Sequence, residues 1–167
     1  GTVGLSAKGH YLFWNNALDS TWYAYSNAEK TSLALSQFIP TSMADERNDV
    51  PNVPYAYGLA GWTENDAFVL LYDRYDIWKV NVKQPKEVVR LTQGREQLTR
   101  YRYLDLDPEN AVLEANLLLR TFNEINKNEG YVMLSKQNKL TDLLSGGFKL
   151  SKPIKARDTD AIVFSKQ

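Results

Sequence analysis

The stretch FVLLYDRYDIWKVNVKQPKEVVRLTQ, residues 68–93, decides the fold. Apolar side chains such as Val69, Leu71 and Val80 recur at alternate positions on both sides of a polar reversal at 73–76. Alternation with a period of two around a polar reversal is typical of antiparallel strands joined by a tight turn. The stretch therefore predicts a three-stranded antiparallel unit.

Two other stretches repeat this pattern: YLFWNNALDSTWYAYSNAEKTSLALSQ at 11–37 and LLLRTFNEINKNEGYVMLSKQNKLTDLLSGG at 117–147. Each has an apolar strand, a polar turn, an aromatic-containing strand, a second polar turn and a strand that ends in leucine. The positions matched by this alignment are Trp22, Trp78 and Tyr131, and then Leu35, Leu91 and Leu144. A period of about 53–57 residues is close to that of a propeller blade with long loops.

A fourth strand can be added to the unit. Residues 58–69 match residues 153–163, with Trp62 on Ala156, Asp66 on Asp160 and Phe68 on Ile162. Both segments read as a strand, a polar turn and a second strand, and Asp and Asn suit the left-handed conformations of tight turns. Four antiparallel strands per unit form the blade pattern of a propeller.

We therefore predict an all-β fold, a partial β-propeller with about three four-stranded antiparallel blades plus extra terminal strands. It forms a single domain over residues 1–167, with units at about 5–38, 58–94 and 99–147 and strands within 151–167. The first unit is expected to lack its innermost strand, so the 151–167 strands and the 11–37 trio could complete one blade between them. Otherwise, open blade edges would allow self-association with another copy.

Two segments have ambiguous patterns. Residues 108–127 also fit a helix, because Pro108 suits a first helical position and the apolar residues have roughly helical spacing. The repeat alignment instead favours a strand from about 116 to 123, with at most a helical turn at 108–111, and we follow the repeat. The long irregular stretch 39–57 is interpreted as a solvated connection between blades, although loops of this length are often functional.

The composition excludes several classes of protein. The chain has 167 residues, 43% of them hydrophobic, which is enough for one ordinary core. Lysines and arginines balance aspartates and glutamates at 20 each, so the basic excess of a DNA-binding protein is missing. No apolar run approaches the roughly 20 residues of a membrane span. We expect no nucleic-acid partner and no membrane span, and we find no signal-peptide pattern at the start of the chain.

Catalytic candidates are scarce. The chain has no cysteine and one histidine, His10, which we interpret as a strand-edge imidazole bonded to its neighbourhood rather than a triad base. No nucleophile elbow is present, and Ser145 in LLSGG comes closest. The four tryptophans, Trp14, Trp22, Trp62 and Trp78, are interpreted as blade core. The sequence indicates no catalytic residue, no metal ligand and no cofactor, and we expect the isolated chain to hydrolyse nothing.

Three segments resemble a known family: PYAYGLAGWTENDAFVLLYDRYDIWKV (54–80), RLTQGREQLTRYRYLDLDPE (90–109) and SKPIKARDTDAIVFSKQ (151–167). They look like the N-terminal β-propeller of secreted bacterial serine peptidases of the prolyl oligopeptidase family, on its dipeptidyl/acylaminoacyl peptidase side. The resemblance runs from about residue 8 to the end. It implies a propeller over an α/β-hydrolase domain that holds the catalytic triad, so no triad residue is carried over to this chain.

The resemblance implies a function and a location. The chain would be the non-catalytic propeller portion of a serine exopeptidase, gating the access of peptide substrates to a hydrolase domain of the same parent protein. It would be periplasmic or secreted. Some family members bind the substrate's amino terminus with paired propeller glutamates, but the acidic pair Asp45–Glu46 does not match that motif and receives no role. The alternative is a stand-alone periplasmic propeller that binds a protein or sugar partner, and a structural interaction module without a ligand also stays open.

Overall fold

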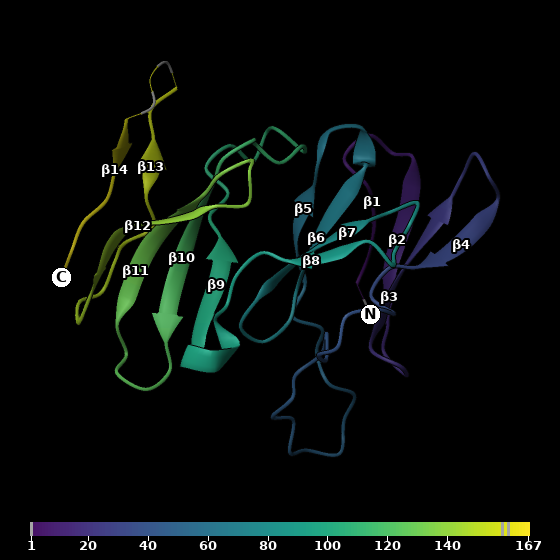
Figure 1. Ribbon diagram of the computed structural model, residues 1–167, viewed down its shortest axis with the longest axis horizontal. Coiled ribbons are helices and arrows are strands. Elements are labelled where there is room, and N and C mark those ends of the chain that lie inside the picture. Colours follow the sequence, from purple (N-terminus) through teal and green to yellow (C-terminus); the bar gives the residue numbers. More distant parts are fainter. Residues whose placement is uncertain (1, 158, 160) are drawn as a thin grey trace.

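Three four-stranded antiparallel sheets follow one another along the chain, each with its strands in sequential order (Figure 1). The computed structural model describes residues 2–157, 159 and 161–167. The first sheet consists of β1 (Val3–Leu5), β2 (Tyr11–Asn16), β3 (Thr21–Ser26) and β4 (Thr31–Ala34). The second consists of β5 (Leu59–Trp62), β6 (Phe68–Tyr72), β7 (Ile77–Asn81) and β8 (Val88–Arg90). The third consists of β9 (Thr99–Tyr103), β10 (Leu117–Asn123), β11 (Glu129–Leu134) and β12 (Leu140–Gly146).

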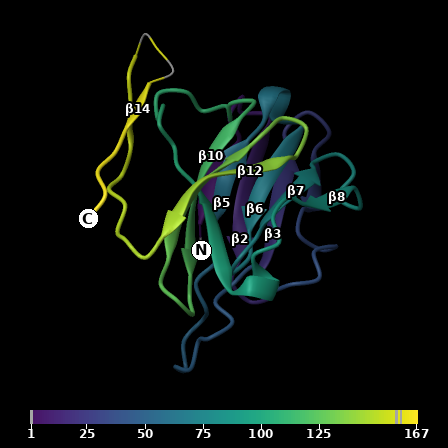
Figure 2. The ribbon, with the colours of Figure 1, turned by 60° about the vertical axis from the view of Figure 1, so that its left-hand side comes forward.

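A two-stranded sheet of β13 (Ile154–Lys155) and β14 (Ile162–Val163) follows the third sheet. The described helical structure is limited to two 3-10 turns, η1 (Glu64–Asp66) and η2 (Arg95–Gln97). Strands make up 43% of the chain and helix 4%, which confirms the predicted all-β partial propeller. Turned by 60°, the sheets are seen stacked one behind another (Figure 2).

The first sheet is complete in itself, which corrects one expectation. Its first strand β1 pairs with β2 through Val3 and Trp14, Gly4 and Phe13, and Leu5 and Leu12. The 151–167 strands do not join this sheet, because β13 and β14 pair with each other beyond the third sheet. A three-residue strand is too short to show an alternating pattern, which is why the sequence did not reveal β1.

The ambiguous segment 108–127 contains a strand and no helix. β10 begins at Leu117 and pairs with both β9 and β11, so the choice of the repeat over helical spacing is confirmed. Leu117 and Leu119 pack against the second sheet. The apolar spacing that resembled a helix thus results from residues that alternate across a strand, together with others in the preceding loop.

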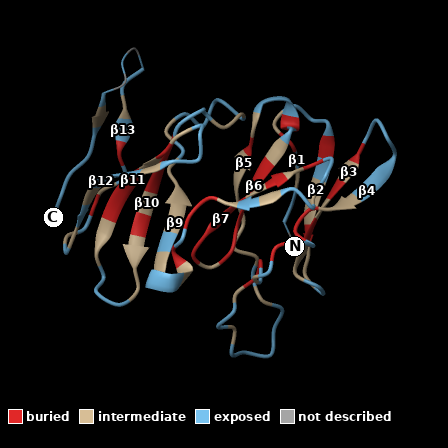
Figure 3. Ribbon diagram, viewed as in Figure 1, coloured by how far each residue is buried: buried red, intermediate tan, exposed pale blue. Residues whose placement is uncertain are grey.

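The second sheet is buried on both faces. On β6, Val69 and Leu71 belong to the core shared with the first sheet, while Leu70 and Tyr72 belong to the core shared with the third. Figure 3 shows this concentration of buried residues in the middle of the molecule. The near-continuous apolar run FVLLY is therefore what a strand between two packed layers requires.

Three of the four tryptophans lie in the core, as expected. Trp22, Trp62 and Trp78 are 0%, 3% and 7% exposed. Trp14 does not: it is half-buried on the other face of the first sheet, where it stacks on Tyr23 at 5.5 Å. Neighbouring strand residues point to opposite faces, so Trp14 cannot share the core face of β2 with Tyr11 and Asn15.

The repeat register needs one correction at Trp78. Trp22 packs toward the second sheet, but Trp78 packs in the same core from the opposite side. The true counterpart of Trp22 is Ile77, because both backbone amides donate to a hydroxyl, on Ser36 at 2.9 Å and on Thr92 at 3.1 Å. A slip of one residue reverses the face of a strand side chain. The proposed match of Asp66 with Asp160 lies outside the described residues.

Candidate functional site

Four connections meet at one edge of the sheets, the lower edge in Figure 1. They are the long loop at 39–57, the β6–β7 turn at 73–76, the β8–β9 connection at 91–98 and the β10–β11 turn at 124–128. We call this the loop edge. Side-chain contacts link the four connections: Thr41 reaches Asp73, Glu46 reaches Arg95, and Arg74 reaches Glu124.

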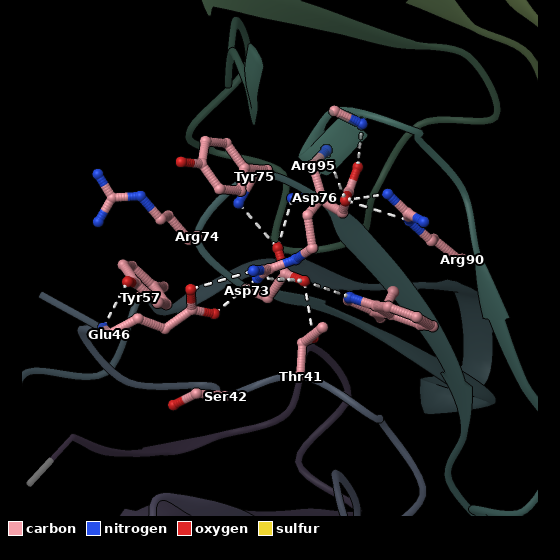
Figure 4. Close-up of polar contacts among 12 residues, drawn as sticks. Thr41, Ser42, Glu46, Tyr57, Asp73, Arg74, Tyr75, Asp76, Arg90 and Arg95 are labelled. Carbon is pink, nitrogen blue, oxygen red and sulfur yellow. Dashed lines mark hydrogen bonds and ion pairs between the residues drawn. The ribbon is translucent and has the colours of Figure 1, made fainter. Parts of the chain in front are cut away.

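Asp73 is the centre of this network (Figure 4). Its carboxylate is fully buried and accepts hydrogen bonds from the Thr41 hydroxyl at 2.7 Å and the Trp78 indole at 3.1 Å. The backbone amides of Tyr75 and Asp76 also donate to it, at 2.8 and 2.6 Å. Burial raises the pKa of Asp73, but these hydrogen bonds outweigh burial and hold that pKa below its ordinary value.

Asp76 performs a similar role toward the third sheet. Its buried carboxylate accepts hydrogen bonds from the Thr92 hydroxyl at 2.7 Å and the Gly94 amide at 2.6 Å. Arg90 forms an ion pair with it at 2.6 Å and also contacts Glu96. The two aspartates of the sequence YDRYD therefore fix the turn and the next connection, a structural role for both.

The acidic pair of the long loop also has structural partners. Glu46 forms a two-point ion pair with Arg95, at 2.6 and 3.1 Å, and its backbone amide donates to the Tyr57 hydroxyl at 2.9 Å. That hydroxyl donates to Asp45 at 3.3 Å. These contacts tie the loop to the second sheet, and the two carboxylates have different ion-pair partners, Arg74 for Asp45 and Arg95 for Glu46.

A hollow of about 290 Å³ opens at the loop edge between the long loop, the β6–β7 turn, β9 and the β10–β11 turn. Its lining combines three arginines, two tyrosines and two carboxylates. These residues are Arg74, Arg100, Arg102, Tyr55, Tyr57, Asp45 and Glu124, together with Ala56. We call it the basic hollow.

Arg102 of β9 is held in this hollow without an acidic partner. Its guanidinium donates to the backbone carbonyls of Tyr101, Asp73 and Arg74, at 2.7, 3.0 and 3.0 Å. The same group lies 4.5 Å from the centre of the Tyr72 ring. Within the described part of the chain Arg102 forms no ion pair, and burial holds its pKa below the ordinary value of arginine. Its positive charge is therefore not neutralised locally.

Glu124 is surrounded by arginines. Arg74, Arg47 and Arg100 lie 2.9, 3.2 and 3.5 Å from its carboxylate, and the Tyr75 hydroxyl donates to it at 3.1 Å. Burial raises the pKa of Glu124, yet the hydrogen bonds from Arg74 and Tyr75 keep it below its ordinary value. Three arginines line the basic hollow together with only two carboxylates, which leaves a local excess of positive charge.

The lowered pKa values predict a loss of stability in acid. Asp73 and Glu124 titrate at lower pH in the folded protein than in the unfolded chain, where their pKa values are about 3.9 and 4.3. Their contribution to stability is complete above those values and is lost as the pH falls through the lower folded values. We expect the urea midpoint to fall steeply below about pH 4 and Asp73→Asn to flatten that fall. A wild-type midpoint that stays constant from pH 5 to pH 2 would contradict this.

His10 lies at the opposite edge, between the first two sheets. Its Nδ1 is 3.1 Å from the buried Asp66, which also accepts a hydrogen bond from the Ser6 hydroxyl at 2.6 Å. The interpretation of His10 as locally bonded holds only in part, because its partner belongs to the second sheet. In a hydrolase triad histidine stands between serine and aspartate, whereas here aspartate stands between the other two.

Among the described residues, no group of three or more His, Asp or Glu side chains could hold a metal ion. No helix in the described ranges is long and apolar enough to cross a membrane.

Apart from Asp45, no residue of the basic hollow stands in a local sequence pattern that predicts a site. Arg47 and Glu124 are 77 positions apart, and Arg74 and Glu124 are 50 apart. Such contacts follow from the packing of sheets and leave no local motif. The arginine-rich strand RYRY, residues 100–103, is the signal that could have pointed to the site.

Comparison with known proteins identifies no family. No protein-family model matches the chain, and no curated protein matches it either. Among solved structures, regucalcin from Agrobacterium tumefaciens, described as a calcium-binding protein, is similar with a TM-score of 0.43 at 12% identity. The match covers 86% of this chain and 42% of the regucalcin chain. A luciferin-regenerating enzyme is similar with a TM-score of 0.44 at 10% identity, over 86% of this chain and 44% of that one.

These findings contradict the predicted membership in the prolyl oligopeptidase family. The two similar solved structures are a regucalcin and a luciferin-regenerating enzyme, and neither is a propeller of such a peptidase. The gating of peptides toward a hydrolase domain loses its support with the family. The chain spans less than half the length of these two structures.

Proposed function

We propose that this chain is a non-catalytic β-propeller unit that binds an anionic partner in the basic hollow. The proposal takes up the alternative function, a propeller that binds a partner, and assigns the binding to the basic hollow. One observation carries it: three arginines and two tyrosines line a hollow at the loop edge that holds only two carboxylates. The periplasmic or secreted location stays a prediction.

The chemistry of the hollow supports recognition of an anion. Arginine presents fixed donors that match carboxylate and phosphate groups. Arg100 is the residue best placed for this, because its side chain is 45% exposed and its contact with Glu124 uses Nε at 3.5 Å. Its guanidinium lies 4.9 Å from the centre of the Phe122 ring, and its terminal nitrogens donate no hydrogen bond within the described residues. A cleft with an excess of one charge also attracts the opposite charge from solution.

The test is a titration of the chain into rhodamine-labelled hexaglutamate, followed by fluorescence anisotropy at low and high salt. Binding should weaken with salt, and Arg100→Gln should weaken it about tenfold, the value of one charge-assisted hydrogen bond. Arg157→Gln, which removes an exposed arginine outside the hollow, is the matched control and should change little. Equal anisotropy with labelled hexaserine would overturn the proposal.

A further inference from the structure

The basic hollow offers three kinds of contact at once. Arg100 supplies donors that are not used within the described chain. Asp45 is 41% exposed and uses Oδ1 for its contacts with Arg47, Tyr57 and Arg74, so that its Oδ2 is open to a hydrogen-bond donor. Tyr55 is 79% exposed and presents an aromatic ring at the rim. A ligand that fits the hollow should use all three.

A simple anion would use only the arginine. An acidic peptide would bring its carboxylates toward Asp45 as well as Arg100, which costs repulsion, and its ionised side chains carry no donor for Oδ2. A ligand in which the ring that enters the hollow carries one carboxylate, several hydroxyl donors and a flat apolar face satisfies each element of the site. The carboxylate pairs with a guanidinium, hydroxyls donate to carboxylate oxygen, and the apolar face covers the tyrosine ring.

We infer that the basic hollow binds an acidic sugar unit, a uronate, with its carboxylate on Arg100, a ring hydroxyl donating to Asp45 Oδ2 and one sugar face against Tyr55. This rests on the proposed function of the same site. The volume of about 290 Å³ lies at the lower end of the range of small-molecule sites and suits a single ring rather than a long segment. The positive charge of the half-buried Arg102, which also lines the hollow, favours a bound anion.

The inference is tested by isothermal titration calorimetry of the whole chain with trigalacturonate, its methyl ester and hexaglutamate. Trigalacturonate should bind at least about tenfold more tightly than the uncharged ester, since one charge-assisted pair is worth that much. Tyr55→Ala should weaken trigalacturonate about fivefold and leave hexaglutamate within about twofold. Tyr25→Ala, a partly exposed tyrosine on the first sheet, is the matched control and should change neither.

Asp45→Asn is expected to change the affinities for trigalacturonate and hexaglutamate in opposite directions. It should weaken trigalacturonate, because an acceptor loses its charge, and strengthen hexaglutamate, because a repulsion is removed. Hexaglutamate binding without trigalacturonate binding, or an equal loss of both in Tyr55→Ala, would overturn the inference and leave the proposed function standing. Failure of both ligands to bind would overturn both. Unchanged thermal melting of each variant ensures that lost binding is not lost folding.

Discussion

Asp73→Ala is expected to lower the free energy of unfolding by about 3–5 kcal/mol, the cost of breaking a buried ionic network by removing one partner. The carboxylate is fully buried, forms an ion pair with Arg95 at 3.3 Å, and accepts hydrogen bonds from Thr41, Trp78 and two backbone amides. Its removal leaves the two amides of a buried turn without an acceptor and releases the long loop at Thr41. Both effects act against the folded state.

Urea unfolding followed by tryptophan fluorescence measures this change. The control is Asp49→Ala, which removes an exposed aspartate from the same loop and should shift the free energy by no more than about 0.5 kcal/mol. If the two variants were equally stable, Asp73 could not be the centre of the loop-edge network. Asp73→Asn should fall between them, because its amide oxygen can still accept from the turn.

Trp78→Ala is expected to cost about 3–5 kcal/mol, the usual range for removing a large aromatic side chain from a core. Trp78 is 7% exposed, packs in the core between the first two sheets and donates its indole N–H to Asp73. The matched control is Trp14→Ala, whose half-buried ring stacks on Tyr23 outside that core and should cost distinctly less. Thermal unfolding by circular dichroism gives both values, and the reverse order would contradict the assignment of faces.

The losses of stability caused by Asp73→Ala and Trp78→Ala should not add in the double variant. Trp78 and Asp73 share a hydrogen bond of 3.1 Å, so the double variant loses that bond only once. We expect the combined loss to be smaller than the sum of the single losses by about 0.5–3 kcal/mol. A strictly additive result would place the whole effect of Trp78 in apolar packing.

The strand architecture could be predicted because each sheet carries its own alternating pattern. Residues 68–93 revealed the second sheet, and the leucines Leu35 and Leu91 mark equivalent strand positions, since both donate their amides to the third strand of their sheet. The match of Trp78 with Trp22 places the repeat register one residue off. It pairs two aromatic residues, although the backbone equivalent of Trp22 is Ile77. Residue type is a weaker guide than hydrogen-bond position when two faces of a sheet are both apolar.

The candidate site could not be predicted to the same extent. The acidic pair Asp45–Glu46 was visible as charge in a long loop, but its partners, Arg74 and Arg95, lie in other connections. The unneutralised charge of Arg102 depends on which backbone carbonyls surround it, and only the folded arrangement of β9 against the β6–β7 turn supplies that information. Charge counted over the whole chain is zero and conceals this local excess.

The second sheet is apolar on both faces and packs against both outer sheets. The stability of each outer sheet therefore depends on the second sheet. The apolar cores of the first and third sheets both include residues of the second sheet, so apolar packing links the two outer sheets through β6 and β7. Amide hydrogen exchange should therefore be graded along the chain and slowest in those two strands. The two-residue strands β13 and β14, with Ile154 73% exposed, should exchange first and open without disturbing the rest.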